Sequence, residues 1–187
     1  MGLNRNDGHN PKRQALNQPN IGLDRDIRHS VVKILNKTLA NEAVLTLKTR
    51  CALWNLHGPG FHDRHTLFDV QYKQLNDISD QIAERARMLD GIAIGCLQEF
   101  LKNTRLDEQP GDVPGIMDLL EDHEAAIRFL REDAKKCSEE YEDEVTHDFL
   151  VEILYRHEKM AWMLRSQIEP ELTGTENEES RIYPTLQ

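Results

Sequence analysis

Helical periodicity of the apolar residues is the feature of this sequence that most restricts its fold. Between residues 23 and 56, apolar side chains recur every three or four positions, which places them on one face of an α-helix. The same spacing recurs from Asp63 to Leu89, and the Asp90-Gly91 that follows is typical of a helix end. The apolar residues that carry the two patterns are Ile27, Val31, Ile34, Leu35, Leu39, Phe68, Leu75, Ile78, Ile82 and Leu89.

Three further helical stretches follow. A short one covers residues 92–104, and two long ones cover residues 115–140 and 144–168, with Pro170 as a stop. Strand-like alternation of apolar and polar residues is not convincing anywhere in the sequence. Four long helices with a short helix in the middle connection predict an all-α fold: a four-helix bundle with one long crossover.

The chain of 187 residues suits a single domain with a sizeable core. We predict a flexible N-terminal arm at residues 1–22, the bundle at 23–168, and a polar, glutamate-rich C-terminal tail at 169–187. No apolar run reaches the roughly 18 residues that a membrane helix requires, and the N-terminus lacks the apolar segment of a secretory signal. We therefore expect no membrane partner.

Charge and cysteine content narrow the partners and the compartment. The three cysteines are odd in number and show no Cys-x-x-Cys spacing, which disfavours a disulfide framework and favours a reducing cytoplasm. The formal net charge of −10 argues against a dominant nucleic-acid-binding surface. We expect DNA binding to be weak or absent, or else strongly dependent on salt, because only the N-terminal arm has an excess of positive charge. Its basic residues are Arg5, Lys12 and Arg13.

Two separated pairs of metal-type ligands lie on the second long helix. His65 and Asp69 form one i,i+4 pair, and Asp80 and Glu84 form the other. At about 100° per residue the four side chains fall on one narrow stripe, yet the pairs are about 16 Å apart along the helix axis. One helix cannot close that gap around an ion. A two-fold axis between antiparallel copies can, because it sets one pair against the other pair of a second chain.

The ligand types restrict the metal. Carboxylates mixed with imidazole suit iron, zinc or manganese, and they fit poorly with copper(I) or an iron–sulfur cluster. The simpler alternative is a solvated helix face, which is the usual place of Asp and Glu side chains. The motif of an ordinary di-iron bundle, Glu-x-x-His on two helices, occurs only once, at Glu144 and His147. The sequence therefore disfavours a di-iron site inside one bundle. The stripe alone leaves two interpretations open: the solvated helix face, which is the more common, and paired metal sites between two chains.

The segment WNLHGPGFHDRHTLFD, residues 54–69, followed by DISDQIAERARMLDG, resembles the signature of the Dps family of ferritin-like proteins. The shared features are, in order, the tryptophan-asparagine, the glycine kink, the aromatic residue, the His-x3-Asp pair and the Asp-x3-Glu-Arg pair. The similarity in pattern covers residues 24–168. It implies a ferritin-like bundle that assembles as a hollow dodecamer, oxidises Fe(II) with hydrogen peroxide or oxygen at dimer-interface sites, and stores the ferric mineral. Many members of the family also protect or bind DNA.

The resemblance also implies roles for single residues. Trp54 would stand beside the ferroxidase site and take up oxidising equivalents. One departure is Leu53, which occupies the place of the family's first histidine ligand. A changed ligand set would alter the iron affinity and favour zinc as a competing metal. The implied ligands are His65, Asp69, Asp80 and Glu84, and the candidates for the missing imidazole are His157, His62 and His57.

Acidic residues are concentrated between residues 137 and 148, where the third long helix ends and the fourth begins. A solvated corner between helices would explain them, and carboxylates also suit the N-terminus of a helix. The resemblance implies instead that three chains meet near this corner around a pore that attracts Fe(II). The residues expected to line the pore are Asp143, Glu144, Asp148 and Glu152.

Two functions of different classes follow from these expectations. The first is a ferroxidase and iron store of the cytoplasm or nucleoid, which consumes Fe(II) and peroxide and so protects against oxidative stress. The second is a dodecamer that has lost ferroxidase competence through Leu53 and serves as a metal buffer or a DNA-compacting protein. A metal-free helical interaction module is a third interpretation, which a single-chain mass in solution would favour.

Overall fold

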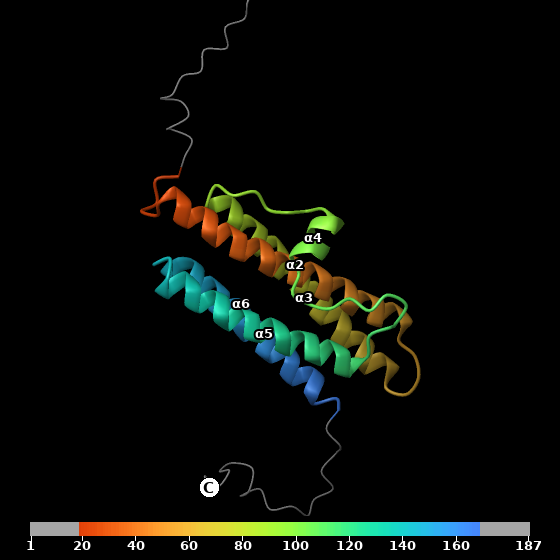
Figure 1. The fold of residues 1–187 in the computed structure, drawn as a ribbon. Coiled ribbons are helices and arrows are strands. Elements are labelled where there is room, and N and C mark those ends of the chain that lie inside the picture. The colour runs from red at the N-terminus through yellow and green to blue at the C-terminus, as the bar shows by residue number, and fades with distance from the viewer. Residues whose placement is uncertain (1–18, 169–187) are drawn as a thin grey trace, which may run out of the picture.

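The computed structural model describes residues 19–168, which form two long helical hairpins packed side by side (Figure 1). The first hairpin pairs α2 with α3 and the second pairs α5 with α6, while the short α4 lies in the long connection between them and contacts α2. No strand occurs among these residues. The predicted all-α four-helix bundle with a short helix in its crossover is therefore confirmed. The helices are α2 (Arg25–Asn55), α3 (Phe61–Met88), α4 (Leu97–Asn103), α5 (Ile116–Glu139) and α6 (Glu144–Arg165).

The described residues cover the predicted bundle but almost none of the predicted arm (1–22) and none of the predicted tail (169–187). At the N-terminal end of α2, Asp24 occupies the N-cap position as expected, although its side chain makes no capping hydrogen bond. Over the part of the chain that the structure describes, no helix is both long and apolar enough to cross a membrane.

The apolar stripes predicted from the sequence form the core of the bundle. On α3, Leu75 and Ile82 have no exposed surface and Phe68 is almost fully buried. On α2, Val31 and Leu35 are buried to the same extent. Each side chain of this size contributes roughly 1.5–3 kcal/mol when it is fully buried, so these stripes provide much of the stability of the bundle. Their partners on the second hairpin include Leu119, Leu130, Leu150, Ile153 and Leu164.

The end of α3 combines a left-handed residue with a close approach between helices. The N–H of Gly91 donates to the Ala86 carbonyl at 2.9 Å and that of Asp90 donates to the Arg87 carbonyl at 3.0 Å, which are the two bonds of a Schellman motif. Asp90, rather than the glycine, takes the positive φ of 64°. Gly91 is needed for space instead, because a Cβ there would lie 2.4 Å from the methyl groups of Val32 on α2.

Helix α4 is shorter than the predicted segment 92–104. Residues before Leu97 are not helical because their backbone bonds to α2. The Asn36 Nδ2 donates to the Ile92 carbonyl at 2.9 Å, and the N–H of Ile94 donates to Asn36 Oδ1 at 3.2 Å. A side chain from a neighbouring helix thus overrides a local helical pattern.

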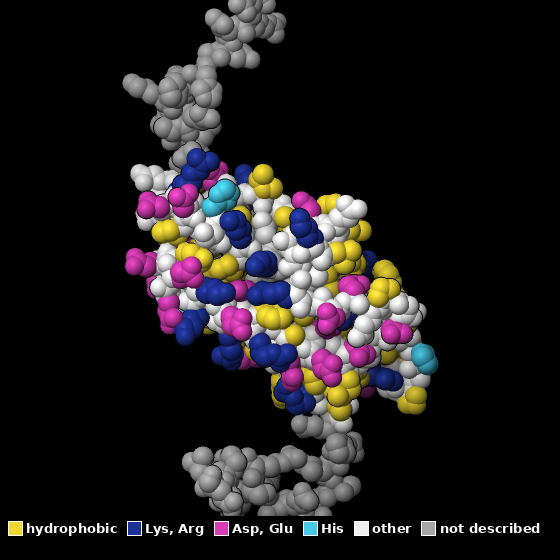
Figure 2. Space-filling model, in the orientation of Figure 1, with side chains coloured by type: hydrophobic (Ala, Val, Ile, Leu, Met, Phe, Trp, Pro, Cys, Tyr) yellow, Lys and Arg dark blue, Asp and Glu magenta, His cyan; other side chains and the backbone are white. Residues whose placement is uncertain are grey.

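The face of the molecule shown in Figure 2 mixes both signs of charge. Acidic and basic side chains are interspersed over it with apolar groups between them, so this face carries no continuous basic surface. Several exposed ion pairs link one helix to another, and each contributes at most about 1 kcal/mol. These pairs are Arg131–Glu158, Arg156–Asp77 and Arg165–Glu124.

Candidate metal centre

The four predicted ligands lie along α3 at positions that the core does not cover. His65, Asp80 and Glu84 are exposed, and the side chain of Asp69 keeps 36% of its surface exposed. The two pairs stay apart, and within residues 19–168 no three His, Cys, Asp or Glu side chains are grouped so that they could hold a metal ion. An ion at either pair therefore needs further ligands from water or from another chain.

The Asp69 carboxylate has a partner that an incoming cation must replace. Lys73, one turn further along α3, places its Nζ 2.6 Å from Asp69 Oδ2. This ion pair is largely exposed, and such pairs contribute less than about 1 kcal/mol. A divalent cation could displace Lys73 at little cost. The ring of His65 lies beside that of Phe61, with 5.4 Å between the ring centroids.

The Trp54 ring is linked to the ligand-bearing helix α3 by the guanidinium of Arg50, which lies beside both. Its side chain is 70% exposed at the end of α2. The Arg50 guanidinium lies 5.0 Å from the centroid of the Trp54 ring and 4.9 Å from that of Tyr72, three residues after Asp69 on α3. Cation–π contacts of this kind hold the exposed indole near the His65–Asp69 pair.

The histidines considered as replacements for the nitrogen missing at Leu53 occupy different surroundings. His62 is exposed in the first turn of α3, three residues before His65. His57 is exposed in the preceding connection, with its Nδ1 3.1 Å from the Asn55 carbonyl oxygen. Both side chains can reach a metal ion that approaches from outside the chain.

His157 lies inside the bundle. Its side chain has no exposed surface, its Nε2 is 3.0 Å from Glu42 Oε1 on α2, and its Nδ1 is 3.0 Å from the Nδ1 of His123 on α5. The suggestion that His157 restores the lost imidazole of the shared site does not fit this position. A ring without exposed surface in one chain cannot reach a site formed with another chain.

Large apolar side chains are exposed on the crossover segment. Ile92, Leu97 and Leu101 are 78%, 66% and 58% exposed, and α4 buries none of its own residues in the chain. Exposed apolar side chains on one segment are a candidate contact with another protein chain.

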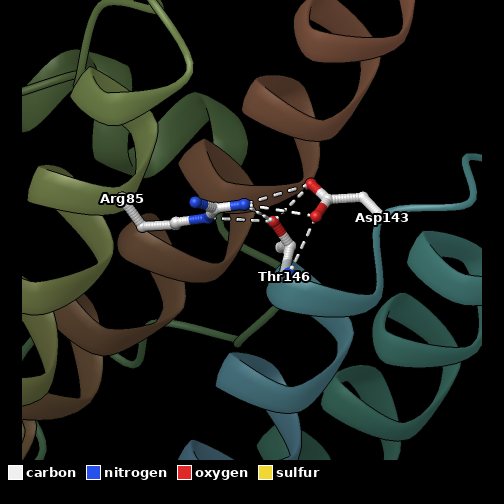
Figure 3. Close-up of polar contacts among 3 residues, drawn as sticks. All are labelled: Arg85, Asp143 and Thr146. Atoms are coloured by element: carbon white, nitrogen blue, oxygen red, sulfur yellow. Dashed lines mark hydrogen bonds and ion pairs between the residues drawn. The ribbon is translucent and has the colours of Figure 1, made fainter. Parts of the chain in front are cut away.

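The predicted pore residues fall into two groups. Asp143 is only 2% exposed, and its carboxylate accepts hydrogen bonds from Arg85 at 3.2 and 3.3 Å and from the Thr146 N–H and hydroxyl at 3.0 and 2.6 Å (Figure 3). It caps α6 and ties α6 to α3, so it is unavailable to a pore. The other three acidic residues are exposed on α6: Glu144, Asp148 and Glu152.

Sequence reasoning missed the buried polar residues Glu42 and His123, and it missed the contacts of Arg85 with Asp143 and Thr146. Glu42 lies three residues from both Leu39 and Leu45, and His123 lies three residues from both Leu120 and Ala126. A polar residue in step with buried apolar neighbours was the available signal.

Comparison with known proteins gives consistent findings. A family model described as the ferritin-like domain matches residues 32–171. A low-temperature-induced protein of Nostoc sp. (strain PCC 7120) is 41% identical over 80% of this chain and 86% of its own length. A DNA protection during starvation protein of Agrobacterium fabrum is 34% identical over 79% of this chain and 93% of its own length.

Solved structures resemble this chain as well. A Dps protein from Vibrio cholerae O1, described as a member of a broad superfamily of ferritin-like diiron-carboxylate proteins, has a TM-score of 0.75 and 26% identity. The match covers 81% of this chain and 97% of that chain. The arrangement of α2 to α6 is thus the ferritin-like bundle.

Proposed function

This chain belongs to the Dps family of ferritin-like proteins, and from that membership we propose that it is a ferroxidase and iron store whose oxidation sites are shared by two chains. Fe(II) is the substrate, hydrogen peroxide or oxygen is the oxidant, and the ferric mineral is kept inside a hollow dodecamer in the cytoplasm. Family membership supports iron oxidation and storage in general. The assignment to particular residues rests on this chain: His65, Asp69, Asp80 and Glu84.

The observation that carries the proposal is the placement of four ligand-type side chains on α3 outside the core. A two-fold axis between antiparallel copies of α3 brings His65 and Asp69 of one chain against Asp80 and Glu84 of the other, which creates two equivalent sites. The exposed apolar residues of α4 supply surface for such a dimer to bury.

The proposed ligands suit the reaction. Carboxylates favour Fe(III) over Fe(II), because their negative charge interacts more strongly with the more highly charged ion. Asp69 joins them when the cation displaces Lys73. The proposed role of Trp54 is to take up oxidising equivalents that exceed what the bound Fe(II) can supply. His62 is the imidazole we propose in place of the one lost at Leu53, since it is exposed one turn before His65, and His57 is the alternative.

An entry route for Fe(II) is proposed at the corner between α5 and α6. Glu144, Asp148 and Glu152 are exposed there and carry negative charge that attracts a divalent cation. Three chains meeting at this corner would place nine carboxylates around one opening. Asp143 is not among them, because it is bonded to Arg85 and Thr146.

A second candidate function is favoured by Leu53. Without the family's first histidine, the site has one nitrogen ligand fewer, which changes its affinity for iron, and zinc is the competing metal we consider. The protein would then be a dodecameric metal buffer or a DNA-compacting protein. The net charge of −10 makes strong DNA binding the less favoured of these.

One assay separates the two functions. Anaerobic loading with Fe(II) followed by peroxide should give fast ferric absorbance in the unmutated protein. In the double variant Asp80→Ala/Glu84→Ala we expect that rate to fall to the rate of iron oxidation in buffer. A matched double variant, Glu121→Ala/Glu132→Ala, removes two exposed carboxylates of α5 and should leave the rate unchanged. Equal rates in all three proteins would refute the ferroxidase assignment and leave the metal buffer.

A further inference from the structure

Several polar atoms inside the bundle have no hydrogen-bond partner. Both carboxylate oxygens of Glu42 and the Nε2 of His157 are buried and make no hydrogen bond, while Oε1 and Nε2 lie 3.0 Å apart and form an ion pair when His157 is protonated. When His157 is neutral with its proton on Nδ1, both atoms carry lone pairs at the spacing of two ligands on one metal ion.

Two more buried side-chain oxygens have no hydrogen-bond partner, one on α2 and one on α3. Thr46 is one turn beyond Glu42 on the same buried face of α2, and its hydroxyl has no partner. Gln71 on α3 donates through Nε2 to the carbonyl of Met160 at 3.0 Å, three residues after His157. Its Oε1 is buried and unpartnered.

The free hydroxyl of Thr46 differs from those of other buried threonines on α2. Thr38 and Thr49 each donate to the carbonyl four residues earlier, at 3.2 and 2.8 Å. Thr46 makes no such bond, so its lone pairs and its proton are both available. The Thr46 hydroxyl oxygen is therefore free to bind a metal ion. Thr49, whose hydroxyl is already bonded, provides a matched comparison.

We propose that Glu42 and His157, with Thr46 and Gln71 beside them, form a second metal site inside each bundle that binds one divalent first-row transition-metal ion. Carboxylate, imidazole, hydroxyl and amide oxygen together make a mixed nitrogen and oxygen donor set, which suits Zn²⁺, Fe²⁺, Mn²⁺ or Co²⁺. This is a single-ion site and does not use the repeated Glu-x-x-His motif of di-iron bundles.

Charge supports a cation at this place. Among the described residues no lysine or arginine pairs with Glu42, and its partner His157 neutralises the buried carboxylate only when that ring is protonated. The nearby Lys48 is neutralised by Asp122 at 2.5 Å. A single added proton would satisfy one contact, whereas a metal ion coordinates several lone pairs at once.

His123 acts in this site by positioning His157. When His157 Nε2 binds the ion, its Nδ1 carries the proton and donates to the Nδ1 of His123, 3.0 Å away. A metal-bound histidine usually has such a partner on its other nitrogen, which fixes the ring and its tautomer.

The test uses the full chain with Asp80→Ala/Glu84→Ala, so that the proposed interface ligands do not contribute. Titration with Co²⁺, followed by its visible absorption, should show one tightly bound ion per chain. Adding Glu42→Gln should abolish it, and Thr46→Val should weaken it while Thr49→Val has no effect. His123→Leu should lower the affinity by about 10- to 100-fold, the usual effect of losing an outer partner.

Two results would overturn the inference: no tightly bound Co²⁺ in the starting variant, or binding that Glu42→Gln leaves unchanged. If Glu42→Gln fails to fold, anomalous diffraction from Co²⁺-soaked crystals of the unmutated chain decides. A cobalt peak at about 2.0–2.2 Å from His157 Nε2 supports the site, and water or a direct Glu42–His157 hydrogen bond there excludes it. The ferroxidase proposal is unaffected by either result, since its ligands lie on the exposed side of α3.

Discussion

Cys137, near the end of α5, shows at the scale of one residue how burial changes the chemistry of a side chain. It has no exposed surface. Burial, together with the negative charges of Asp143 and Asp133, raises the pKa of its thiol to about 12, against 9.0 for a free cysteine side chain. The folded chain therefore keeps this thiol protonated over a pH range in which the unfolded chain loses the proton.

This difference predicts a loss of stability at alkaline pH. Above about pH 9 the unfolded state binds fewer protons than the folded state, so the free energy of unfolding should fall by roughly 1.4 kcal/mol per pH unit towards pH 12. Cys137→Ala should remove this part of the slope. Urea unfolding between about pH 8 and 10.5 measures it, with Cys51→Ala, at a half-buried position, as the control. Parallel slopes for the unmutated protein and Cys137→Ala would contradict the prediction.

At the scale of the helices, Arg85 joins the end of α3 to the beginning of α6. Its Nε and Nη2 donate to the Thr146 hydroxyl at 3.0 and 2.9 Å, and Nη2 also donates to Asp143 (Figure 3). The side chains of Arg85 and Asp143 are only 13% and 2% exposed. The other polar links between α3 and α6, from Arg156 to Asp77 and from Gln71 to the Met160 carbonyl, lie further along the helices, so the Arg85 group fixes how the two hairpins meet at this end.

Arg85→Ala should therefore destabilise the bundle strongly. Removing the guanidinium leaves the buried Asp143 carboxylate without its cation, and breaking a buried pair in this way costs about 3–5 kcal/mol. The matched variant Arg131→Ala removes the exposed pair with Glu158 and should cost less than about 1 kcal/mol. Urea unfolding of both variants gives the comparison. Similar losses in the two would show that the Arg85 group does not hold the hairpins together.

At the scale of the whole molecule, the single chain exposes surface that suits an assembly. Leu97 and Leu101 of α4 and the paired ligands of α3 are accessible, and none of them belongs to the core of the chain. A dodecamer with two-fold contacts between chains would bury the first group and complete the sites of the second.

The assembly predicts a mass of about twelve chains of 21.7 kDa in light scattering. Leu97→Asp/Leu101→Asp places two charges on the exposed side of α4, and we expect it to reduce the mass because charges are unfavourable at the centre of an interface. Circular dichroism should show that the helices remain. A single-chain mass for the unmutated protein, or an unchanged mass for the variant, would exclude α4 as the contact.

Much of the fold could be predicted from the sequence, and the deviations have specific causes. The long helices follow from apolar residues such as Leu75 and Ile82, whose spacing is a local property. The helix predicted from residue 92 begins at Leu97 because Asn36, distant in sequence, bonds the intervening backbone. The sequence predicted where α3 ends. It did not predict that Asp90 takes the positive φ and that Gly91 leaves space for Val32.

The roles of the candidate site residues were predicted less well where they depend on whether the side chain is buried. His65 and Glu84 lie at exposed positions on α3, and their role as ligands stays a prediction. The sequence predicted His157 as a candidate metal ligand and Asp143 as a pore residue. Both side chains are in fact buried and bonded within the chain. Their chemistry depends on which side chain of another helix faces them, and spacing along one helix does not contain that information.

The sequence by itself determined the helices, their apolar faces and the two ligand pairs of α3, because each depends on residues within a few turns of one another. Only the tertiary structure decided that Glu42, His123 and His157 meet inside the bundle, and that Arg85 reaches Asp143 across it. The reason is physical. Burial and pairing are set by contacts between helices that are distant in sequence, and the same histidine or aspartate is a surface ligand or an interior partner according to those contacts alone.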